Sequence, residues 1–336
     1  MQCAATVRRP RHLSMPDARP PQPHESSVPL RSLIAVVGPT AVGKSALALG
    51  LAARVSGEIV SADSRLLYRG LDIGTAKPTR EERAAVPHHL VDVAEVDQPW
   101  SLAEYKGEAL RAIAGIHTRG HVPLLVGGTG QYVRALLEGW IIPRTMPDPE
   151  LRAELAARAQ GEGALALYRE LQVRDPQAAA SIDPRNVRRV MRALEVIYLT
   201  GHPFSAQRTR MRVGFRTLCL GLRMPREELY ARADARIETM LTAGWVEEVR
   251  GLLSRGFSPD LPAFSALGYR EIARHVQGQL SLEECRTEIR RATRRLVRHQ
   301  ANWFRATDPD VVWLAAGPQA LDTATVHAEK FLAMPH

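Results

Sequence analysis

The fold is decided by residues 33–55, which read LIAVVGPTAVGKSALALGLAARV. The apolar, β-branched run at 33–37 predicts a buried strand, and the apolar periodicity at 46–55 predicts a helix. Between them, residues 38–45 match GxxxxGK followed by Ser or Thr, a pattern whose backbone amides cradle phosphate oxygens. Lys44 adds a positive charge and Ser45 a hydroxyl that can bind Mg²⁺. The motif predicts a diphosphate or triphosphate site.

Further strands are predicted at residues 58–62 and 122–126, and later at 218–222 and 311–314. Strands that alternate with helices indicate an α/β fold with a P-loop NTPase-like parallel sheet core, whose ligands bind at the carboxyl ends of the strands. Ala-, Leu- and Arg-rich periodicity after Pro143 predicts an inserted helical domain. The expected boundaries are a disordered Pro/Arg-rich tail at 1–30, the core at 31–145, the insertion at 146–212, the second part of the core with a basic helix at 213–318, and a C-terminal tail at 319–336.

The composition indicates an anionic partner without naming it. Lys and Arg number 45 against 36 Asp and Glu, which gives a formal charge of +9, although a basic surface with no particular partner would give the same balance. The three cysteines, Cys3, Cys219 and Cys285, form no CxxC pair, which argues against disulfides and a local zinc site and favours the reducing cytosol. No run of about 18 apolar residues occurs, so no membrane span is predicted.

An acidic residue follows the second predicted strand, at Asp63. Most P-loop enzymes use an acid at a strand end to help hold Mg²⁺, yet the third strand ends in Gly127-Gly128-Thr129. A carboxylate beside a phosphate cradle can be a metal ligand, a general base or a helix N-cap. The residues alone leave these three roles of Asp63 open.

The last long helix is predicted to carry a basic stripe. Arg286, Arg290, Arg294 and Arg298 recur every four residues and so share one helical face. The residues at 289, 296 and 303 recur every seven residues and are expected to face the core. Like charges at this spacing repel one another, so an anionic partner would relieve them, and the alternative is a solvated basic face.

Six blocks of sequence, in order, resemble the tRNA dimethylallyltransferase family over residues 33–305. They read SADSRLLYRGLDIGTAKPT from Ser61, PHHLVDV from Pro87, GGTGQYVRALLEG from Gly127, DPQAAASIDPRNVRRVMRALEV from Asp175, ALGYRE from Ala266 and TRRLVRHQANWFR from Thr293. No CxxC and His pattern follows them, which favours the bacterial form of the family. The resemblance implies transfer of a dimethylallyl group from its diphosphate to the N6 amine of the adenine 3′ of the anticodon.

The resemblance also implies the roles of the catalytic residues. Asp63, Thr40, Lys44 and Arg236 fall at the catalytic positions, although Arg232 lies one helical turn from Arg236. The diphosphate, with Mg²⁺ on Ser45, is expected to bind to Gly38, Pro39, Thr40, Ala41, Val42, Gly43, Lys44 and Ser45. Asp63 would accept a proton from the adenine amine as the nitrogen attacks. The chain is expected to act as a cytoplasmic monomer.

The tRNA-binding residues implied by the resemblance come from both parts of the core and from the insertion. They are Asp63, Ser64, Arg65, Leu66, Thr129, Arg152, Arg188, Arg189, Val190, Met191, Arg192, Ser265, Ala266, Leu267, Gly268, Tyr269, Arg270, Arg298, His299, Gln300 and Arg305. RNA loops are bound through splayed bases, stacking and phosphate charge. Aromatic residues among these arginines, Tyr269, Trp303 and Phe304, are expected to offer stacking surfaces.

Other conspicuous residues have simpler interpretations. His88 and His89 are adjacent and therefore point apart, which favours packing in a turn over metal binding. Gly128 and Gly130 are expected to be turn glycines that let the backbone approach the substrate. Trp100, Trp140 and Trp245 are expected in the core.

Three other functions compete with the family's activity. A P-loop kinase of a small molecule would turn over ATP and need no RNA, and an isopentenyltransferase acting on free AMP or ATP would have little need for the arginines of the insertion and the last helix. An RNA-binding protein whose P-loop only senses nucleotide would not depend on Asp63.

Overall fold

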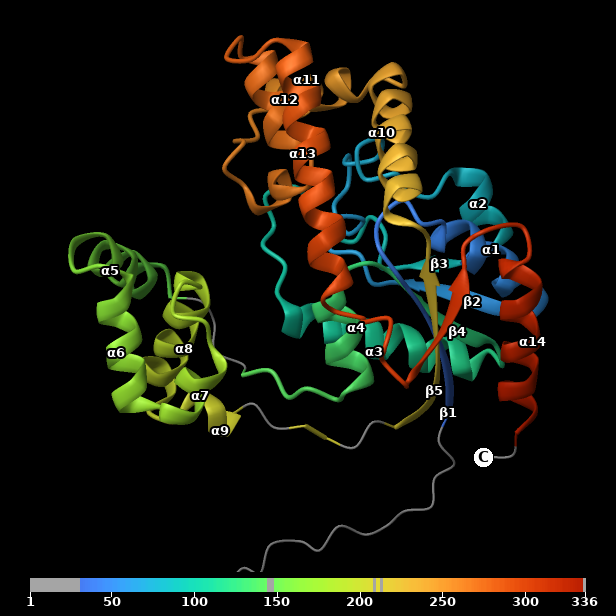
Figure 1. Ribbon diagram of the computed structural model, residues 1–336, viewed down its shortest axis with the longest axis horizontal. Helices are drawn as coiled ribbons and strands as arrows, with labels where there is room; N and C mark the ends of the chain where they lie inside the picture. Colours follow the sequence, from blue (N-terminus) through green and yellow to red (C-terminus); the bar gives the residue numbers. More distant parts are fainter. Residues whose placement is uncertain (1–30, 144–147, 208–209, 212–213, 335–336) are drawn as a thin grey trace, which may run out of the picture.

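A computed structural model of the chain describes residues 31–143, 148–207, 210–211 and 214–334, and the tail predicted at 1–30 lies outside them. The structure is built on a six-stranded, parallel sheet with the strand order β3-β2-β4-β1-β5-β6 (Figure 1). The predicted α/β class with a parallel sheet is confirmed.

The strands and their bounds are β1 (Arg31–Val37), β2 (Gly57–Ser61), β3 (His88–His89), β4 (Val122–Val126), β5 (Phe215–Arg223) and β6 (Val311–Ala315). The helices of the first part are α1 (Lys44–Arg54), α2 (Arg80–Ala85), α3 (Leu102–Thr118) and α4 (Gly130–Leu137). The insertion holds α5 (Pro149–Gly161), α6 (Ala164–Arg174), α7 (Pro176–Ser181), α8 (Val187–Thr200) and α9 (Phe204–Gln207). After β5 come α10 (Arg226–Thr242), α11 (Trp245–Ser254), the 3₁₀ turn η1 (Pro262–Ser265), α12 (Tyr269–Val276), α13 (Leu282–Ala301) and α14 (Ala320–Ala333).

Strand β1 lies in the interior of the sheet, between β4 and β5. Val36 is opposite Val126 on β4 and Leu220 on β5, and all of β1 after its first residue is buried. A strand with neighbours on both sides and helices on both faces must be apolar throughout, which is why this run lacks the alternation of a half-exposed strand. The loop after β1 therefore opens at the middle of the sheet's carboxyl edge.

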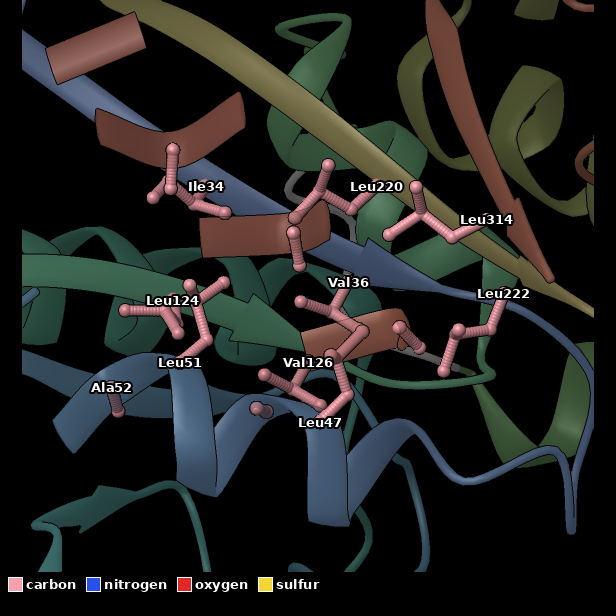
Figure 2. Packing of buried hydrophobic residues seen from close by; sticks show 14 of the residues in the cluster. Ile34, Val36, Leu47, Leu51, Ala52, Leu124, Val126, Leu220, Leu222 and Leu314 are labelled. Carbon is pink, nitrogen blue, oxygen red and sulfur yellow. The ribbon is translucent and has the colours of Figure 1, made fainter. Parts of the chain in front are cut away.

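Helix α1 packs on one face of this sheet. Leu47 and Leu51 of α1 lie against the side chains of Ile34, Val36 and Leu124 and their neighbours in one hydrophobic cluster (Figure 2). Burial of each such side chain contributes about 1.5 to 3 kcal/mol. This packing fixes the start of α1, and with it the phosphate-binding motif, relative to the strands.

The adjacent histidines form part of the sheet and not the predicted turn. Residues 88–89 make the short edge strand β3, paired with Ile59 and Val60 of β2. His89 Nε2 lies 2.6 Å from the carboxylate of Glu58, which is 2% exposed and also accepts hydrogen bonds from Arg119 and His121. Two residues of strand give too little periodicity for a sequence prediction.

Helices α5 to α9 form a separate body with their own core (Figure 1). Leu155, Leu167, Leu171 and Leu194 are fully buried in it. The chain leaves the core after α4 and returns to it at β5, so this body is inserted in the connection between β4 and β5. Its described helices run from Pro149 to Gln207, inside the expected limits of 146–212.

The predicted C-terminal tail is instead a helix, α14. Ala324, Ala328 and Phe331 recur on one helical face and are buried beside α1. A Cβ on Gly50 of α1 would lie 2.8 Å from Leu321, so the absence of a side chain at Gly50 lets α14 approach. Alanine contributes little to a search for hydrophobic periodicity, which is why the prediction missed this helix. In the described part of the chain, none of the helices combines the length and the apolar character needed to cross a bilayer.

The buried Glu58 predicts a pH-dependent stability. The hydrogen bond from Arg119, with further bonds from His89 and His121, lowers the pKa of Glu58 to about 2 against burial, which acts in the opposite direction. The stabilisation is present above the unfolded pKa of about 4.5 and is lost as the pH falls towards 2. Glu58→Gln should lower the free energy of unfolding at pH 7 by about 3 kcal/mol, because three donors lose their anion.

Urea denaturation at pH 7 and at pH 3 checks this expectation. The difference between the native protein and Glu58→Gln should shrink at pH 3, while Glu329→Gln, at an exposed position on α14, should change little at either pH. An equal difference at both pH values would contradict the assignment.

Candidate active site

The loop between β1 and α1 adopts a phosphate-binding conformation. Gly38 and Gly43 have positive φ angles of 146° and 107°, and Ala41 between them has φ 64°. A Cβ on Gly38 would lie 2.7 Å from the carbonyl oxygen of Leu222 on β5, so glycine is required there. Among the described residues, none accepts a hydrogen bond from the amides of Ala41, Val42 or Gly43. These amides and the start of α1 form a cradle for an anion.

Lys44 occupies the floor of this cradle. Its ammonium donates to the carbonyl of Pro39 at 2.8 Å and lies close to the loop after β4. Burial lowers the pKa of Lys44 to about 8; the charge of Asp63 opposes that shift and the charge of Arg236 adds to it. Burial likewise lowers the pKa of Arg236. Two cations and one carboxylate therefore share a poorly solvated site, which has a net positive charge for an anionic ligand.

Both arginines of α10 that the sequence offered face the phosphate-binding loop. Arg236 interacts with the charges of Lys44 and Asp63, whereas the guanidinium of Arg232 lies 3.6 Å from the position of a Cβ on Gly43. The two side chains are one helical turn apart on the same face, as the sequence predicts. The charge of Arg236 therefore acts on Lys44 and Asp63, whereas Arg232 lies at the loop itself.

Asp63 lies in a turn at the carboxyl end of β2. Its Oδ1 accepts the amide of Arg65 at 2.9 Å, and no helix begins until Arg80, so the N-cap role left open by the sequence is excluded. The amide of Ser64 donates to Thr129 Oγ1 at 3.1 Å, and the amide of Thr129 donates to the carbonyl of Ala62. The loops after β2 and β4 therefore support each other.

A cavity of about 550 Å³ connects Asp63 and Arg236 with a more apolar region. Thr40, Asp63 and Arg236 line it near the phosphate-binding loop, and Ser265 and Arg270 line it on the side of η1 and α12. The sequence did not predict several of its lining residues, which are Gly74, Thr75, Ile237, Met240, Phe264 and Leu296. These residues come from four separate segments, and no local pattern in the sequence connects them.

The far wall of the cavity depends on one tryptophan. The indole of Trp245 fits between Gly74 and Gly268, where a Cβ would lie 2.0 Å and 2.1 Å from it. Trp245 is 1% exposed, as expected of a core residue, yet it also lines the cavity. Glu248, one turn further along α11, accepts the amides of residues 72, 73 and 74 and the hydroxyl of Tyr269.

Some of the predicted tRNA contacts cannot be made by the side chains concerned. Tyr269 is fully buried beside Trp245, where burial and Glu248 raise the pKa of its hydroxyl, so it offers no stacking surface. Val190 is fully buried in the core of the insertion. Both predictions failed because each residue lies in a basic or polar block whose buried positions the sequence could not separate.

Side chains of other predicted contacts are bound to groups within the protein. Arg152 and Arg192 both bind the carboxylate of Glu195, which is 1% exposed. Arg65 donates to the carbonyl of Pro262. The other exposed positions among the predicted residues are Arg188, Arg189, Ser265, Arg270, Arg298, His299 and Arg305, the other partly buried side chains include Ser64, Leu66, Thr129, Met191 and Leu267, and Ala266 and Gly268 are buried.

The basic stripe of α13 has partners within the protein. Arg294 pairs with Asp234 at 2.6 Å, and Arg290 and Arg286 pair with Glu238 at 2.9 Å and 3.6 Å. Both acids lie on α10. The expectation that an external anion relieves this stripe is therefore wrong for these three arginines, because the prediction considered α13 alone.

The glycines after β4 accommodate side chains of α13 and of the turn that follows it. A Cβ on Gly130 would lie 2.1 Å from Trp303, and one on Gly128 would lie 2.4 Å from Gln300 Nε2. The close approach is thus made by the protein's own side chains, which corrects the expected approach to substrate. Gln300, expected to contact tRNA, is directed towards the phosphate-binding loop.

The fold and the site define an α/β protein of the P-loop class with a carboxylate beside its phosphate cradle. The family model for IPP transferase matches residues 66–307. The chain belongs to this IPP transferase family.

Similar proteins carry consistent descriptions. A tRNA dimethylallyltransferase of Chloroflexus aurantiacus is 52% identical over 289 residues, covering 86% of this chain and 98% of that protein. One from Thermomicrobium roseum is 54% identical over 275 residues, which cover 82% of this chain and 84% of that protein. The solved tRNA isopentenylpyrophosphate transferase of Bacillus halodurans is 39% identical with a TM-score of 0.66, over 90% of this chain and 96% of that one. A eukaryotic dimethylallyltransferase solved while acting on tRNA has a TM-score of 0.76 at 26% identity, over 90% of this chain and 80% of that one.

The lowered pKa of Lys44 predicts how binding of inorganic pyrophosphate depends on pH. Lys44 loses its charge as the pH rises through about 8, so the affinity for pyrophosphate should fall by up to about tenfold per pH unit above that value. Calorimetry between pH 7 and 9.5 measures the change. In Lys44→Arg the guanidinium stays charged, so the ratio of the two affinities should change near pH 8; a constant ratio would contradict this role of Lys44.

Proposed function

We propose that this protein transfers the dimethylallyl group of dimethylallyl diphosphate to the exocyclic N6 amine of the adenine 3′-adjacent to the anticodon of tRNA, releasing diphosphate. The observation that carries the proposal is that Asp63 and Arg236, whose charges both act on Lys44, line a cavity that also has an apolar part. An anion site, a base and an apolar space are what this reaction requires. We further propose that the chain acts as a monomer in the cytoplasm.

In the proposed reaction the adenine nitrogen attacks C1 of the dimethylallyl group. The bond between C1 and the diphosphate oxygen breaks, and the bonding electrons leave with the diphosphate. The amides of residues 41–43, with Lys44 and Arg236, stabilise the negative charge that develops there. Asp63 accepts the proton that the amine loses on forming its new bond to carbon.

Mg²⁺ fits the start of α1. The hydroxyl of Ser45 is exposed in the first turn beside the cradle, and a hard cation with one protein oxygen completes its shell with phosphate oxygens and water. No cluster of three His, Cys, Asp or Glu side chains suited to a metal occurs in the ranges that the structure describes, so the diphosphate itself would supply further ligands. A bound Mg²⁺ would neutralise charge on the leaving group.

The tRNA would lie across the open side of the cavity. The reacting base is stacked beside the anticodon and must be extracted to reach Asp63. The exposed Arg270 lines the cavity, Arg298 lies in the last turn of α13, and Arg305 lies just beyond it. Arg188 and Arg189 are exposed on the insertion. These side chains would contact phosphates on either side of the extracted base.

The choice of acceptor separates this function from its rivals. Radiolabelled dimethylallyl diphosphate is offered to unmodified tRNA with adenine 3′ of the anticodon, to the same tRNA with that adenine changed, and to AMP. Label only on the first tRNA is expected. Label on AMP alone would assign the protein to free-nucleotide isopentenyl transfer, and no label on any acceptor would favour a kinase or an RNA-binding protein.

The role of Asp63 gives a prediction for the rate. Asp63→Asn keeps the size of the side chain and removes the base, so kcat should fall by about 10² to 10⁴-fold. The Kd for tRNA, measured by filter binding, should stay within about threefold, because replacing this one carboxylate by an amide leaves the contacts to the tRNA phosphates intact. Asp72→Asn, at an exposed acid away from the cavity lining, serves as the control. Full activity of Asp63→Asn would contradict the mechanism.

The insertion gives a prediction for salt dependence. Arg188→Gln should weaken tRNA binding and reduce the slope of log Kd against log salt by about 0.7 to 0.9, the value for one lost phosphate contact. Arg54→Gln, on α1 beside α14, should leave the slope unchanged. Equal slopes for Arg188→Gln and the native protein would place the RNA away from the insertion.

A further inference from the structure

The side chain of Gln300 joins the two loops that build the active site. Its Oε1 accepts the amide of Thr40 in the phosphate-binding loop at 2.7 Å, and its Nε2 donates to the carbonyl of Gly128 after β4 at 3.1 Å. The two loops follow neighbouring strands, and α13 brings Gln300 to them from about 170 residues further along the chain than Gly128. A single amide group therefore bridges both loops.

The surrounding residues hold this bridge in place. Trp303, one turn beyond Gln300, packs on Gly130, and its carbonyl accepts two hydrogen bonds from Arg134 of α4. The end of α13 is thus fixed to the loop after β4 independently of Gln300. Gly128 has no Cβ, which leaves the space that the amide occupies 2.4 Å from the position of that atom.

Hydrogen bonds also connect the bridge to Asp63, the proposed general base. Thr129, next to Gly128, accepts the amide of Ser64, and Ser64 follows Asp63 directly. A continuous path therefore runs from Thr40 through Gln300 and residues 128–129 to Asp63. The diphosphate cradle lies at one end of this path and the carboxylate at the other.

We propose that Gln300 is a positioning residue, which holds the diphosphate cradle and the carboxylate of Asp63 at the separation that the transfer needs. This inference rests on the proposed function and deepens it. It replaces the expected contact between Gln300 and tRNA with one inside the protein. The neighbouring Arg298 and His299 are exposed and remain able to contact RNA.

The bridge requires a group that accepts and donates at once. An amide does both, whereas an ionised carboxylate only accepts and a methionine does neither. Gln300→Met keeps the length of the side chain and removes both bonds. We expect kcat to fall by about tenfold to 10²-fold, as when reacting groups are displaced by about 1 Å, while KM for tRNA stays within about threefold.

Gln300→Glu gives a signature in the pH profile. When protonated, the introduced carboxyl accepts from Thr40 through its C=O and donates to Gly128 through its O–H, as the amide does. When ionised, it loses the donor and places a negative charge beside the phosphate cradle. The ratio of the rate of this variant to that of the native protein should therefore rise as the pH falls from 8 to 5.5. A purely structural defect would give a ratio that does not change with pH, and that result would overturn the proposal.

Gly128→Ala provides a matched test from the other partner. The new methyl group would displace the amide of Gln300 and so reproduce the effect of Gln300→Met. In a Gln300→Ala background that side chain is absent, and the next neighbour, Lys44 Nζ, lies at an ordinary 3.6 Å. Gly128→Ala should then cost little further activity. Additive losses in the double variant would contradict the bridge.

Binding of inorganic pyrophosphate distinguishes a failure of the Gln300 bridge from a failure of the proposed transfer function. Gln300→Met should weaken this binding by about threefold or more, because the cradle is no longer held at Thr40, and calorimetry needs no transfer. If the native protein transfers no label, the proposed function fails, but the pyrophosphate affinities still test the bridge. Unchanged kcat and pyrophosphate affinity, or a loss confined to KM for tRNA, would show that Gln300 is not a positioning residue.

Discussion

The site depends on keeping two cations and one carboxylate close together where water is scarce. Burial lowers the pKa of Lys44 and the charge of Arg236 acts in the same direction, whereas the charge of Asp63 opposes both, and the resulting pKa of about 8 keeps the ammonium charged at neutral pH. An arriving diphosphate supplies the missing negative charge. The three charged groups come from the segments after β1 and β2 and from one face of α10, so these segments must meet. The packing of α1 against β1 fixes the position of the phosphate-binding loop among them (Figure 2).

Glycines let large side chains pack closely at four positions around the active site. Gly74 and Gly268 admit the indole of Trp245, and Gly128 and Gly130 admit Gln300 and Trp303. In each case a large side chain from the second part of the core enters a space that any Cβ would fill. Glycine costs about 0.5 to 1 kcal/mol of chain entropy in an ordered element, and each of these positions gains a close contact between distant segments in return.

Sequence reasoning succeeded where the signal is local. The strand at 33–37, the cradle at 38–45 and the acid at Asp63 each follow from neighbouring residues, and their meeting follows from the geometry of a parallel sheet. It failed where a partner lies far along the chain. The arginines of α13 were expected to face either an external anion or solvent, because their partners Asp234 and Glu238 are about 50 to 60 residues away. The apolar wall of the cavity, with Trp245, was missed for the same reason.

The ion pairs between the arginines of α13 and the acids of α10 give α13 a role in positioning the active site. By binding Asp234 and Glu238, α13 fixes the rotation of α10, and residues 232 and 236 lie on that helix within the same two turns. At its other end α13 carries Gln300 to the two loops. One helix thus determines where the arginines of α10 and the phosphate cradle lie relative to each other. Its exposed Arg298 and His299 directly precede Gln300 on the same turn, so an RNA held by them would rest against the element that orders the site.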